Sequence, residues 1–377
     1  MKDNNNPFVL YGYKGSEYFC DRREETLRLL NCLRQEQNAT LIAPRRMGKT
    51  GLIHHVFNKI QTEEPEVRCF YMDIFPTHSL EEFVRLFAQT VIGRLDTPSQ
   101  AAFRNIQAFF SSWRPKISID PVSGLPSMSL DIRPSEERES LRQIFEYMKQ
   151  SGRRCYVAID EFQQILNYPQ DGVEALLRSY VQFLPNVYFI FSGSQQHVME
   201  QMFLAPSRPF FQSTMLMSLF GIDRDEYRSF ANGFFSNQGR QMDTDCFSYI
   251  YDLAGGITWY VQAILHKIYF YSDIDLNKNT VDMVLDEILN EQSVSYQNFC
   301  AWLTGNQYYL LRAIASEGCV AAPLSRKFIS DHGLPAISSV KTALKSLEEK
   351  QLVQRGLQGY SVSDIFFGLW LRRNCRA

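Results

Sequence analysis

Lys49 and Thr50 follow a glycine within the stretch 39–53, which reads ATLIAPRRMGKTGLI. An apolar run precedes these residues and apolar residues recur at helical spacing after them, so the sequence predicts a strand, a tight turn and a helix. The first N–H groups of a helix have no intrahelical partner, and the helix dipole adds partial positive charge there. The stretch is therefore typical of a loop that binds phosphate groups.

The loop departs at one position from the pattern G-x-x-x-x-G-K-[ST], because Ala43 stands where the first glycine belongs. Ala43 is compatible with the loop if its φ is negative, since only a positive φ penalises a Cβ. Gly48 lets the backbone approach a ligand closely. Lys49 is expected to reach the β- and γ-phosphates, and the Thr50 hydroxyl is expected to hold Mg²⁺. The remaining loop residues expected at the nucleotide are Pro44, Arg45, Arg46, Met47 and Gly51.

Two adjacent acids, Asp160 and Glu161, end a second apolar run at 155–159. P-loop NTPases hold Mg²⁺ through the Ser or Thr of the loop and an Asp at the end of such a strand. Asp160 fits that metal ligand, and Glu161 is placed to orient and deprotonate an attacking water. The alternative is a buried strand followed by a solvated acidic turn, which the phosphate-binding loop upstream makes the weaker interpretation.

Two further candidates lie downstream of the acidic pair. The apolar strand at 186–191 is followed by Ser192 and Ser194, either of which could hydrogen-bond the γ-phosphate or its water; a simple turn is the alternative. Arg208 lies in a loop bounded by two prolines. A loop arginine can reach a phosphate in the same or a neighbouring subunit, and the alternative is a solvated loop charge.

In P-loop ATPases of this layout, the segment just before the first strand covers the base of the nucleotide, so this segment supplies candidate contacts to the base. Phe19 and Asp21 lie there, just ahead of a helix predicted at 24–34. Asp21 is expected to cap this helix, with Glu24 three residues on as the second member of a capping box.

Strand and helix patterns alternate over residues 1–200, which predicts an α/β core with a parallel sheet and ligands at the carboxyl ends of its strands. Polar–apolar alternation on both sides of a Ser-Gly pair predicts an inserted β-hairpin at about 116–132. Residues 201–300 are helical in pattern and form a predicted lid. Residues 301–377 show three helices and a two-stranded ribbon, the arrangement of a winged helix-turn-helix.

Composition limits the partners. The chain has 377 residues with 45% apolar content and a net charge of −2. This charge argues against a protein that binds nucleic acid over most of its surface. From Gln307 onward, however, the balance is +5, against −7 for the remainder. Residues 307–377 could therefore bind DNA, but Glu348 and Glu349 interrupt the lysines of the third helix, so a protein partner is an equal alternative.

The eight cysteines are scattered without metal-binding spacing, as expected for buried thiols in a reduced cytoplasm. The N-terminus lacks the apolar region of a signal peptide, and no apolar run approaches 18 residues. We therefore expect a cytoplasmic protein without a membrane span.

With these motifs, the chain resembles the prokaryotic AAA+-like P-loop ATPases of the archaeal-ATPase and STAND group. The resemblance implies ATP as the nucleotide, a lid after the core and a C-terminal winged helix. It favours Mg²⁺-dependent ATP hydrolysis used as a conformational switch. The alternative is an ATP-gated DNA-binding or scaffold protein with little hydrolysis. The segments that carry the resemblance are Phe19–Arg22, Ala43–Thr50, Ile159–Glu161, Gly193-Ser194, Gly255-Gly256 and Ile365–Arg373.

Overall fold

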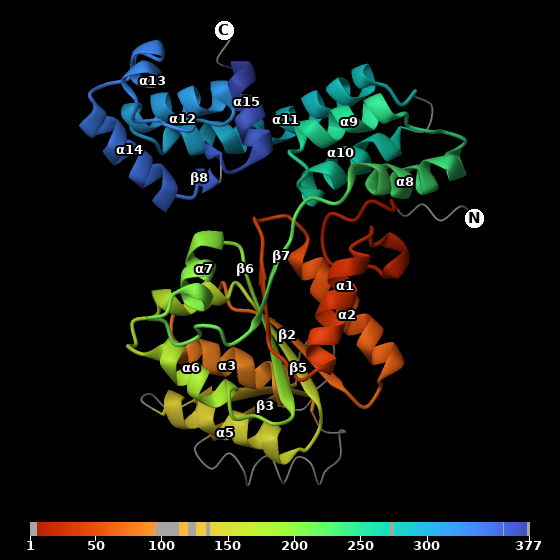
Figure 1. Ribbon diagram of the computed structural model, residues 1–377, viewed down its shortest axis with the longest axis vertical. Helices are drawn as coiled ribbons and strands as arrows, with labels where there is room; N and C mark the ends of the chain where they lie inside the picture. The colour runs from red at the N-terminus through yellow and green to blue at the C-terminus, as the bar shows by residue number, and fades with distance from the viewer. Residues whose placement is uncertain are drawn as a thin grey trace. The chain divides into compact units, whose positions relative to one another are not determined.

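The computed structural model describes residues 6–374 except 93, 96–112, 120–125, 133–135, 272–274 and 357, with backbone alone for the strands at 113–119 and 126–132. The chain divides into two compact units. One is Val9–Asp223, and the other is Arg224–Ala377 together with the residues up to Phe8 (Figure 1).

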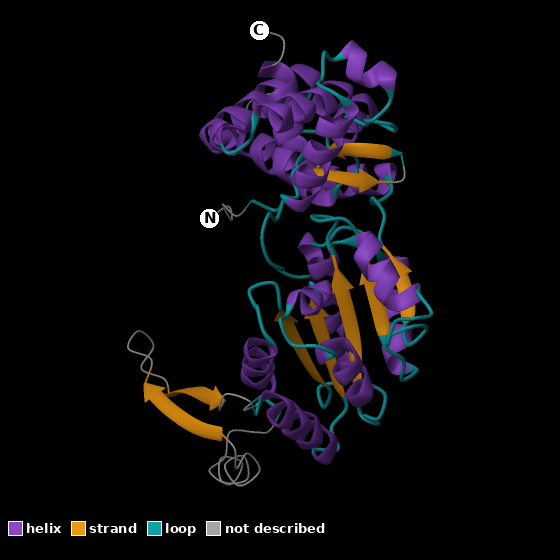
Figure 2. Cartoon of the chain, turned by 90° about the vertical axis from the view of Figure 1, so that its left-hand side faces the viewer, coloured by secondary structure: helices purple, strands orange, loops and turns teal. Residues whose placement is uncertain are grey.

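A five-stranded parallel sheet with the order β2-β5-β6-β1-β7 forms the centre of the first unit (Figure 2). This confirms the α/β core with a parallel sheet. Strands β5 and β6 are buried along their whole length, because helices cover both faces of the sheet. The strands are β1 (Ala39–Ile42), β2 (Arg68–Asp73), β5 (Cys155–Asp160), β6 (Val187–Gly193) and β7 (Met215–Ser218).

The register of the sheet aligns the ends of its strands. Asp73 at the end of β2 is paired with Asp160 at the end of β5. Gly193 at the end of β6 is paired with Ile42 at the end of β1. The acidic pair, Ser194 after β6 and the loop after β1 therefore begin at the same carboxyl edge, where ligands bind in open α/β sheets.

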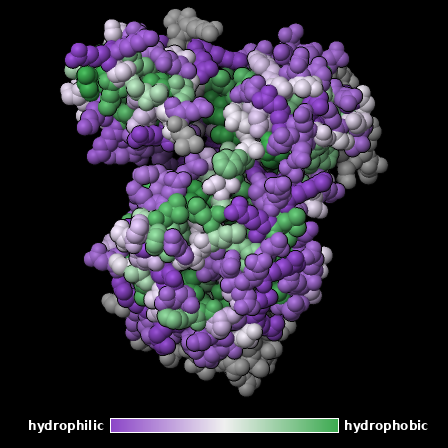
Figure 3. Space-filling model, viewed as in Figure 1, coloured by the Kyte–Doolittle hydropathy of each residue, from purple (hydrophilic) through white to green (hydrophobic). Residues whose placement is uncertain are grey.

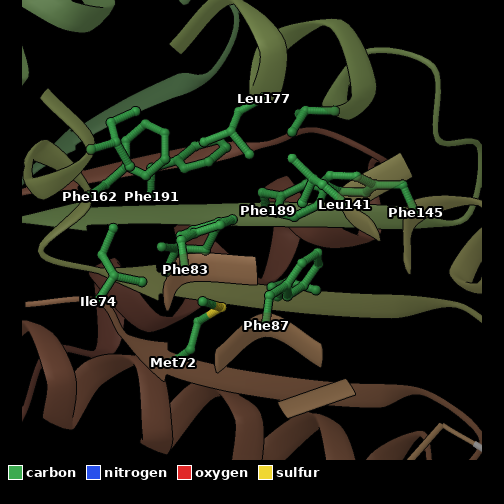
Figure 4. Packing of buried hydrophobic residues seen from close by; sticks show 14 of the residues in the cluster. Met72, Ile74, Phe83, Phe87, Leu141, Phe145, Phe162, Leu177, Phe189 and Phe191 are labelled. Carbon is green, nitrogen blue, oxygen red and sulfur yellow. The ribbon is translucent and has the colours of Figure 1, made fainter. Parts of the chain in front are cut away.

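Two layers of helices cover the sheet. In Figure 1, α1 and α2 lie on one side and α3, α5 and α6 on the other. Aromatic rings from α3, α5 and β6 interdigitate on the second side (Figure 4). Burial of each such ring contributes about 1.5–3 kcal/mol. The helices are α1 (Arg23–Arg34), α2 (Lys49–Glu63), α3 (Leu80–Val91), α5 (Glu137–Gln150), α6 (Val173–Val181) and α7 (Gln196–Leu204).

A cluster of packed phenylalanine rings fixes the segment that follows the acidic pair. The ring of Phe191 on β6 lies 4.5 Å from that of Phe162 and 5.1 Å from that of Phe210. Phe162 opens the short 3-10 helix η2 (Phe162–Asn167) and is fully buried. Because this ring cannot move without opening the core, η2 is held against the end of β6.

The capping box predicted for α1 is wrong. The residue before the helix is Arg22, with φ 59°, and its side chain makes no capping hydrogen bond. Asp21 also has a positive φ, of 46°. A capping side chain needs an extended backbone at the N-cap position, and the left-handed turn at Asp21 and Arg22 removes that geometry.

The second unit is helical. Within it, α15 packs on the preceding helices, with the ring of Phe366 4.8 Å from Tyr260 and the ring of Phe367 5.0 Å from Tyr296. Its elements are α8 (Arg224–Phe235), η3 (Ser236–Gln238), α9 (Thr244–Leu253), α10 (Thr258–Phe270), α11 (Lys278–Ala301), α12 (Gly305–Glu317), α13 (Arg326–Asp331), α14 (Ile337–Glu349), β8 (Val353–Gly356), β9 (Gly359–Val362) and α15 (Ile365–Asn374).

The N-terminal segment belongs to this second unit. Phe8 is fully buried, with its ring 5.4 Å from Phe235 and 5.8 Å from Tyr269. The Asn6 side-chain amide donates to the carbonyl of His266 at 2.7 Å, and His266 Nδ1 donates to the carbonyl of Phe8 at 2.7 Å. The chain thus begins in the second unit, forms the whole first unit and then returns.

Two strands outside the main sheet form an antiparallel pair, β3 (Trp113–Ile119) with β4 (Pro126–Ile132). The face of the molecule seen in Figure 3 is mostly hydrophilic, with hydrophobic residues scattered over it. Of the helices in the described part of the chain, none has both the length and the apolar character needed to cross a membrane.

Candidate functional site

The loop between β1 and α2 has the backbone of a tight turn. Gly48 has φ 97° and Arg46 has φ 68°, so the chain twice enters the left-handed region before the helix begins. Ala43 has no positive φ and is fully buried, and its Cβ therefore carries no backbone penalty. The alanine at the first glycine position of the motif is compatible with the turn.

Lys49 folds back over this loop. Its ammonium donates to the carbonyls of Ala43 at 2.9 Å and Pro44 at 3.2 Å, and the residue is only 6% exposed. Burial lowers the pKa of Lys49, while the charges of Glu161 and Asp160 act in the opposite direction. Among the described residues, the hydrogen-bond partners of this buried ammonium are two neutral carbonyls, so it is well suited to an incoming phosphate.

Asp160 is the centre of a hydrogen-bond network at the end of β5. It is 4% exposed, and its Oδ2 accepts from Thr50 Oγ1 at 2.8 Å and from the Tyr71 hydroxyl at 2.8 Å. Its Oδ1 accepts from the backbone N–H of Glu161 at 3.0 Å. Hydroxyl and carboxylate oxygens are ligands that Mg²⁺ prefers, so the Thr50–Asp160 pair fits that ion.

Glu161 lies beside Ser194, as their strands predict. The hydroxyl of Ser194 donates to Glu161 Oε2 at 2.7 Å, and the backbone N–H of Ser194 approaches the same oxygen at 3.4 Å. Glu161 has φ 54°, a strained value for a residue with a Cβ. Strain of this kind clusters at functional sites. Ser192, the other candidate, is fully buried in β6, where its hydroxyl finds no hydrogen-bond partner among the described residues.

An aromatic group covers the first turns of α2. The ring of Phe19 stacks on that of His55 with centroids 4.3 Å apart, and the Tyr13 hydroxyl lies 2.9 Å from His55 Nδ1. A Cβ at Gly51 would lie 3.5 Å from the Phe19 ring, in ordinary contact. Burial and the charge of Lys59 lower the pKa of His55, which favours the neutral, stackable imidazole.

Arg22 connects the start of α1 to the loop between β1 and α2. It is 2% exposed, and its guanidinium donates to the carbonyls of Met47 at 2.8 Å and Phe220 at 3.0 Å and to Glu25 at 2.9 Å. Because Arg22 has a left-handed backbone, its side chain points inward instead of along α1. The position of the loop is therefore set partly from outside the motif.

Arg208 does not join this group of residues. Its guanidinium forms an ion pair with Glu174 of α6 at 2.6 Å. Burial raises the pKa of Glu174, and the charge and hydrogen bond of Arg208 oppose that shift. Within one chain, the Arg208 guanidinium thus compensates the charge of a buried acid.

Sequence reasoning missed Tyr71, His55, Tyr13 and Gln163. Tyr71 carried a usable signal, because it is a hydroxyl-bearing residue two positions before the acidic end of an otherwise apolar strand. Gln163, whose amide donates to Glu161 Oε2 at 2.5 Å, carried none, since one glutamine in a polar turn is unremarkable without the fold.

Two family models match the chain. A family described as "ATPase domain predominantly from Archaea" matches residues 19–264. A family described as "Probable winged helix domain" matches residues 294–373, which include α12–α15. The search of curated proteins found no match.

Solved structures share this fold at low sequence identity. The Walker-type ATPase paby2304 of Pyrococcus abyssi is 19% identical with a TM-score of 0.65, over 97% of this chain and 99% of that chain. The ORC2 protein of Aeropyrum pernix is 14% identical with a TM-score of 0.53, over 100% and 99%. The ORC1 protein of the same organism, solved in complex with DNA, is 14% identical with a TM-score of 0.53, over 95% and 93%.

The parallel sheet, the loop between β1 and α2 and the C-terminal winged helix thus agree with both family models and with the solved neighbours. The ATPase model alone spans well over half of the chain. This protein belongs to the family of ATPase domains found predominantly in Archaea.

Proposed function

We propose that this protein binds ATP with Mg²⁺, hydrolyses it and uses the cycle as a conformational switch. The observation that carries the proposal is the convergence of Thr50, Asp160, Glu161 and Ser194 at one carboxyl edge of the sheet. Hydrogen bonds join Thr50 to Asp160 and Ser194 to Glu161. The Thr50 hydroxyl, the Asp160 carboxylate as metal ligand and the Glu161 carboxylate as general base therefore lie around the start of α2, where a phosphate binds best.

The binding roles follow from these positions. Lys49 and the backbone of residues 44–51 hold the phosphates, and Phe19 and Asp21 line the base. Thr50 and Asp160 supply oxygen ligands for Mg²⁺, which when bound offsets the negative charge of the phosphates. Tyr71 donates its hydroxyl to Asp160 and so holds this metal ligand in place, as residues that hydrogen-bond to metal ligands generally do.

Glu161 acts as the general base. It takes the proton of a water that attacks the γ-phosphorus, the bond from that phosphorus to the β–γ bridging oxygen breaks, and ADP and phosphate result. Ser194 keeps the carboxylate in one orientation through its hydroxyl. Loss of the γ-phosphate releases the elements that were tied to it, and this release is the switch. Arg208 has no part in the reaction within its own chain, because Glu174 holds it.

Single-turnover hydrolysis tests the proposal. With the full chain in excess over radiolabelled ATP, we expect phosphate release with Mg²⁺ and at least tenfold slower release with EDTA, because Thr50 and Asp160 alone leave the phosphate charge uncompensated. Equal release in both arms would contradict the metal assignment. No release in either arm, with ATP bound, would overturn hydrolysis as the function.

A second candidate is ATP-gated DNA binding through the winged helix. Lys341, Lys345 and Lys350 are exposed on or just after α14, the helix that enters the major groove in DNA-binding relatives of this motif. Two of them are engaged within the unit: Lys345 lies 3.7 Å from Glu349, and the Lys350 ammonium donates to the Gln307 side chain at 3.1 Å. ORC1 of Aeropyrum pernix, which shares the fold, is solved with DNA.

Salt dependence decides this candidate. If the winged helix binds duplex DNA, the affinity of the full chain for a labelled duplex falls between 50 and 200 mM salt, because phosphate contacts release counterions. Lys341→Glu should then weaken binding by about tenfold or more, while Lys14→Glu, in the other unit, should change it little. The absence of binding at 50 mM salt, with or without ATP, would exclude this function.

A further inference from the structure

Gln163 contacts the proposed base directly. It is the second residue of η2, two positions after Glu161, and it is 5% exposed. Its side-chain amide donates to Glu161 Oε2 at 2.5 Å. Ser194 donates to the same oxygen, so two side chains from separate parts of the chain hold one carboxylate oxygen.

The fold makes room for this amide. A Cβ at Gly193 would lie 2.4 Å from Gln163 Oε1 and 2.5 Å from the sulfur of Met199, distances that real Cβ atoms do not reach. Gly193 has no positive φ, so its backbone does not require glycine. The absence of a side chain at the end of β6 is therefore explained by space, which the Gln163 amide and the Met199 side chain fill.

The carboxylate of Glu161 determines which way the Gln163 amide faces, and this orientation lowers the stability of the fold. An ionised carboxylate only accepts hydrogen bonds, so the NH₂ group must face Glu161 and the oxygen must face Gly193. That oxygen is buried and has no hydrogen-bond partner among the described residues. A buried, unsatisfied amide oxygen destabilises a fold, so its presence calls for a compensating function.

We propose that Gln163 is a positioning residue for Glu161. Together with Ser194 it holds Oε2, which leaves Oε1 of the same carboxylate as the oxygen that meets the attacking water. A carboxylate held at one oxygen keeps a single orientation, and a base oriented in advance removes part of the entropic barrier to proton transfer. This assignment rests on the proposed hydrolysis. It adds Gln163 of η2 to Glu161 and Ser194, which directly follow β5 and β6.

Two variants of the full chain test the proposal. Gln163→Leu keeps the approximate shape of the side chain and removes its donor; Gln163→Met does the same with a flexible side chain if leucine does not fold. We expect either variant to lower the single-turnover rate at saturating Mg·ATP by about tenfold, with the ATP dissociation constant changed less than twofold. Gln164→Leu is the matched control, because its amide donates to the backbone of Thr77 at 2.8 Å and not to the site.

A double-mutant comparison separates positioning from structure. In the Glu161→Gln background, Gln163→Leu should cause no further loss of rate, because the residue acts only through that carboxylate. An additional loss of tenfold there, an unchanged or higher rate in the single variant, or a parallel loss of ATP affinity would each overturn the assignment. If the parent chain cleaves ATP and Gln163→Leu matches it, this inference alone fails. If the parent cleaves none, the proposed function fails and this inference fails with it.

Discussion

Glu161→Gln is expected to lower the single-turnover rate of ATP hydrolysis by roughly 10²- to 10⁴-fold, the range that a general base contributes. The change is nearly isosteric, and the amide oxygen of glutamine still accepts a hydrogen bond from Ser194, whose hydroxyl lies 2.7 Å from the carboxylate in the parent. Only the ability to take a proton from water is removed. The ATP dissociation constant should therefore change by less than about threefold.

The measurement is phosphate release under single-turnover conditions beside an equilibrium titration with ATP. Glu81→Gln is the control, because it makes the same chemical change on α3, where the carboxylate pairs with Arg85 at 2.6 Å on the surface. We expect this control to hydrolyse ATP at the parental rate. Full activity in Glu161→Gln would show that another group activates the water, and loss of ATP binding would show that the residue is needed for the shape of the site.

Lys49→Ala is expected to weaken ATP binding by roughly 10²- to 10³-fold, because hydrogen bonds from an ammonium to charged phosphate oxygens are worth about 1.5–3 kcal/mol each. In the structure this ammonium donates to two neutral carbonyls, those of Ala43 and Pro44. Phosphate oxygens compete well for it because they carry charge. The substitution also removes a buried cation, so it should not lower the stability of the first unit as an ordinary core truncation does.

Titration with a fluorescent ATP analogue, together with a thermal unfolding curve for each variant, gives both quantities. Lys59→Ala is the matched control: it lies on the same helix, is 45% exposed and is 3.9 Å from Glu63. We expect it to bind ATP as the parent does. If Lys49→Ala bound ATP as tightly as Lys59→Ala, the loop between β1 and α2 would not be the phosphate site.

The fold could be predicted because its signals are local. The apolar runs that became β1, β5 and β6 are short, continuous and bounded by turn residues, as expected for strands buried on both faces. The order of the elements then placed Thr50, Asp160 and Ser194 at one edge without any knowledge of pairing. The hydrogen bonds from Thr50 to Asp160 and from Ser194 to Glu161 agree with that placement.

The remaining features depend on contacts between distant parts of the chain. Arg22 reaches the carbonyl of Phe220, and no pattern around either residue predicts that contact. The predicted cap at Asp21 failed because a left-handed turn, set by the inward path of Arg22, outweighs the local preference for a capping box. The role of Gln163 can be recognised only from its contact with Gly193, and no signal in the neighbouring sequence explains why position 193 is a glycine.

The burial of Phe8 among the helices of the second unit has a consequence for how the chain comes apart. A protease that cut between Asp223 and Arg224 would sever one of the two covalent crossings between the units, while the other, from Phe8 to Val9, stays intact. The two fragments would still be held together by the ring of Phe8 and by the hydrogen bonds between the N-terminal segment and His266. The nicked protein would therefore migrate as two fragments in denaturant and as one particle under native conditions.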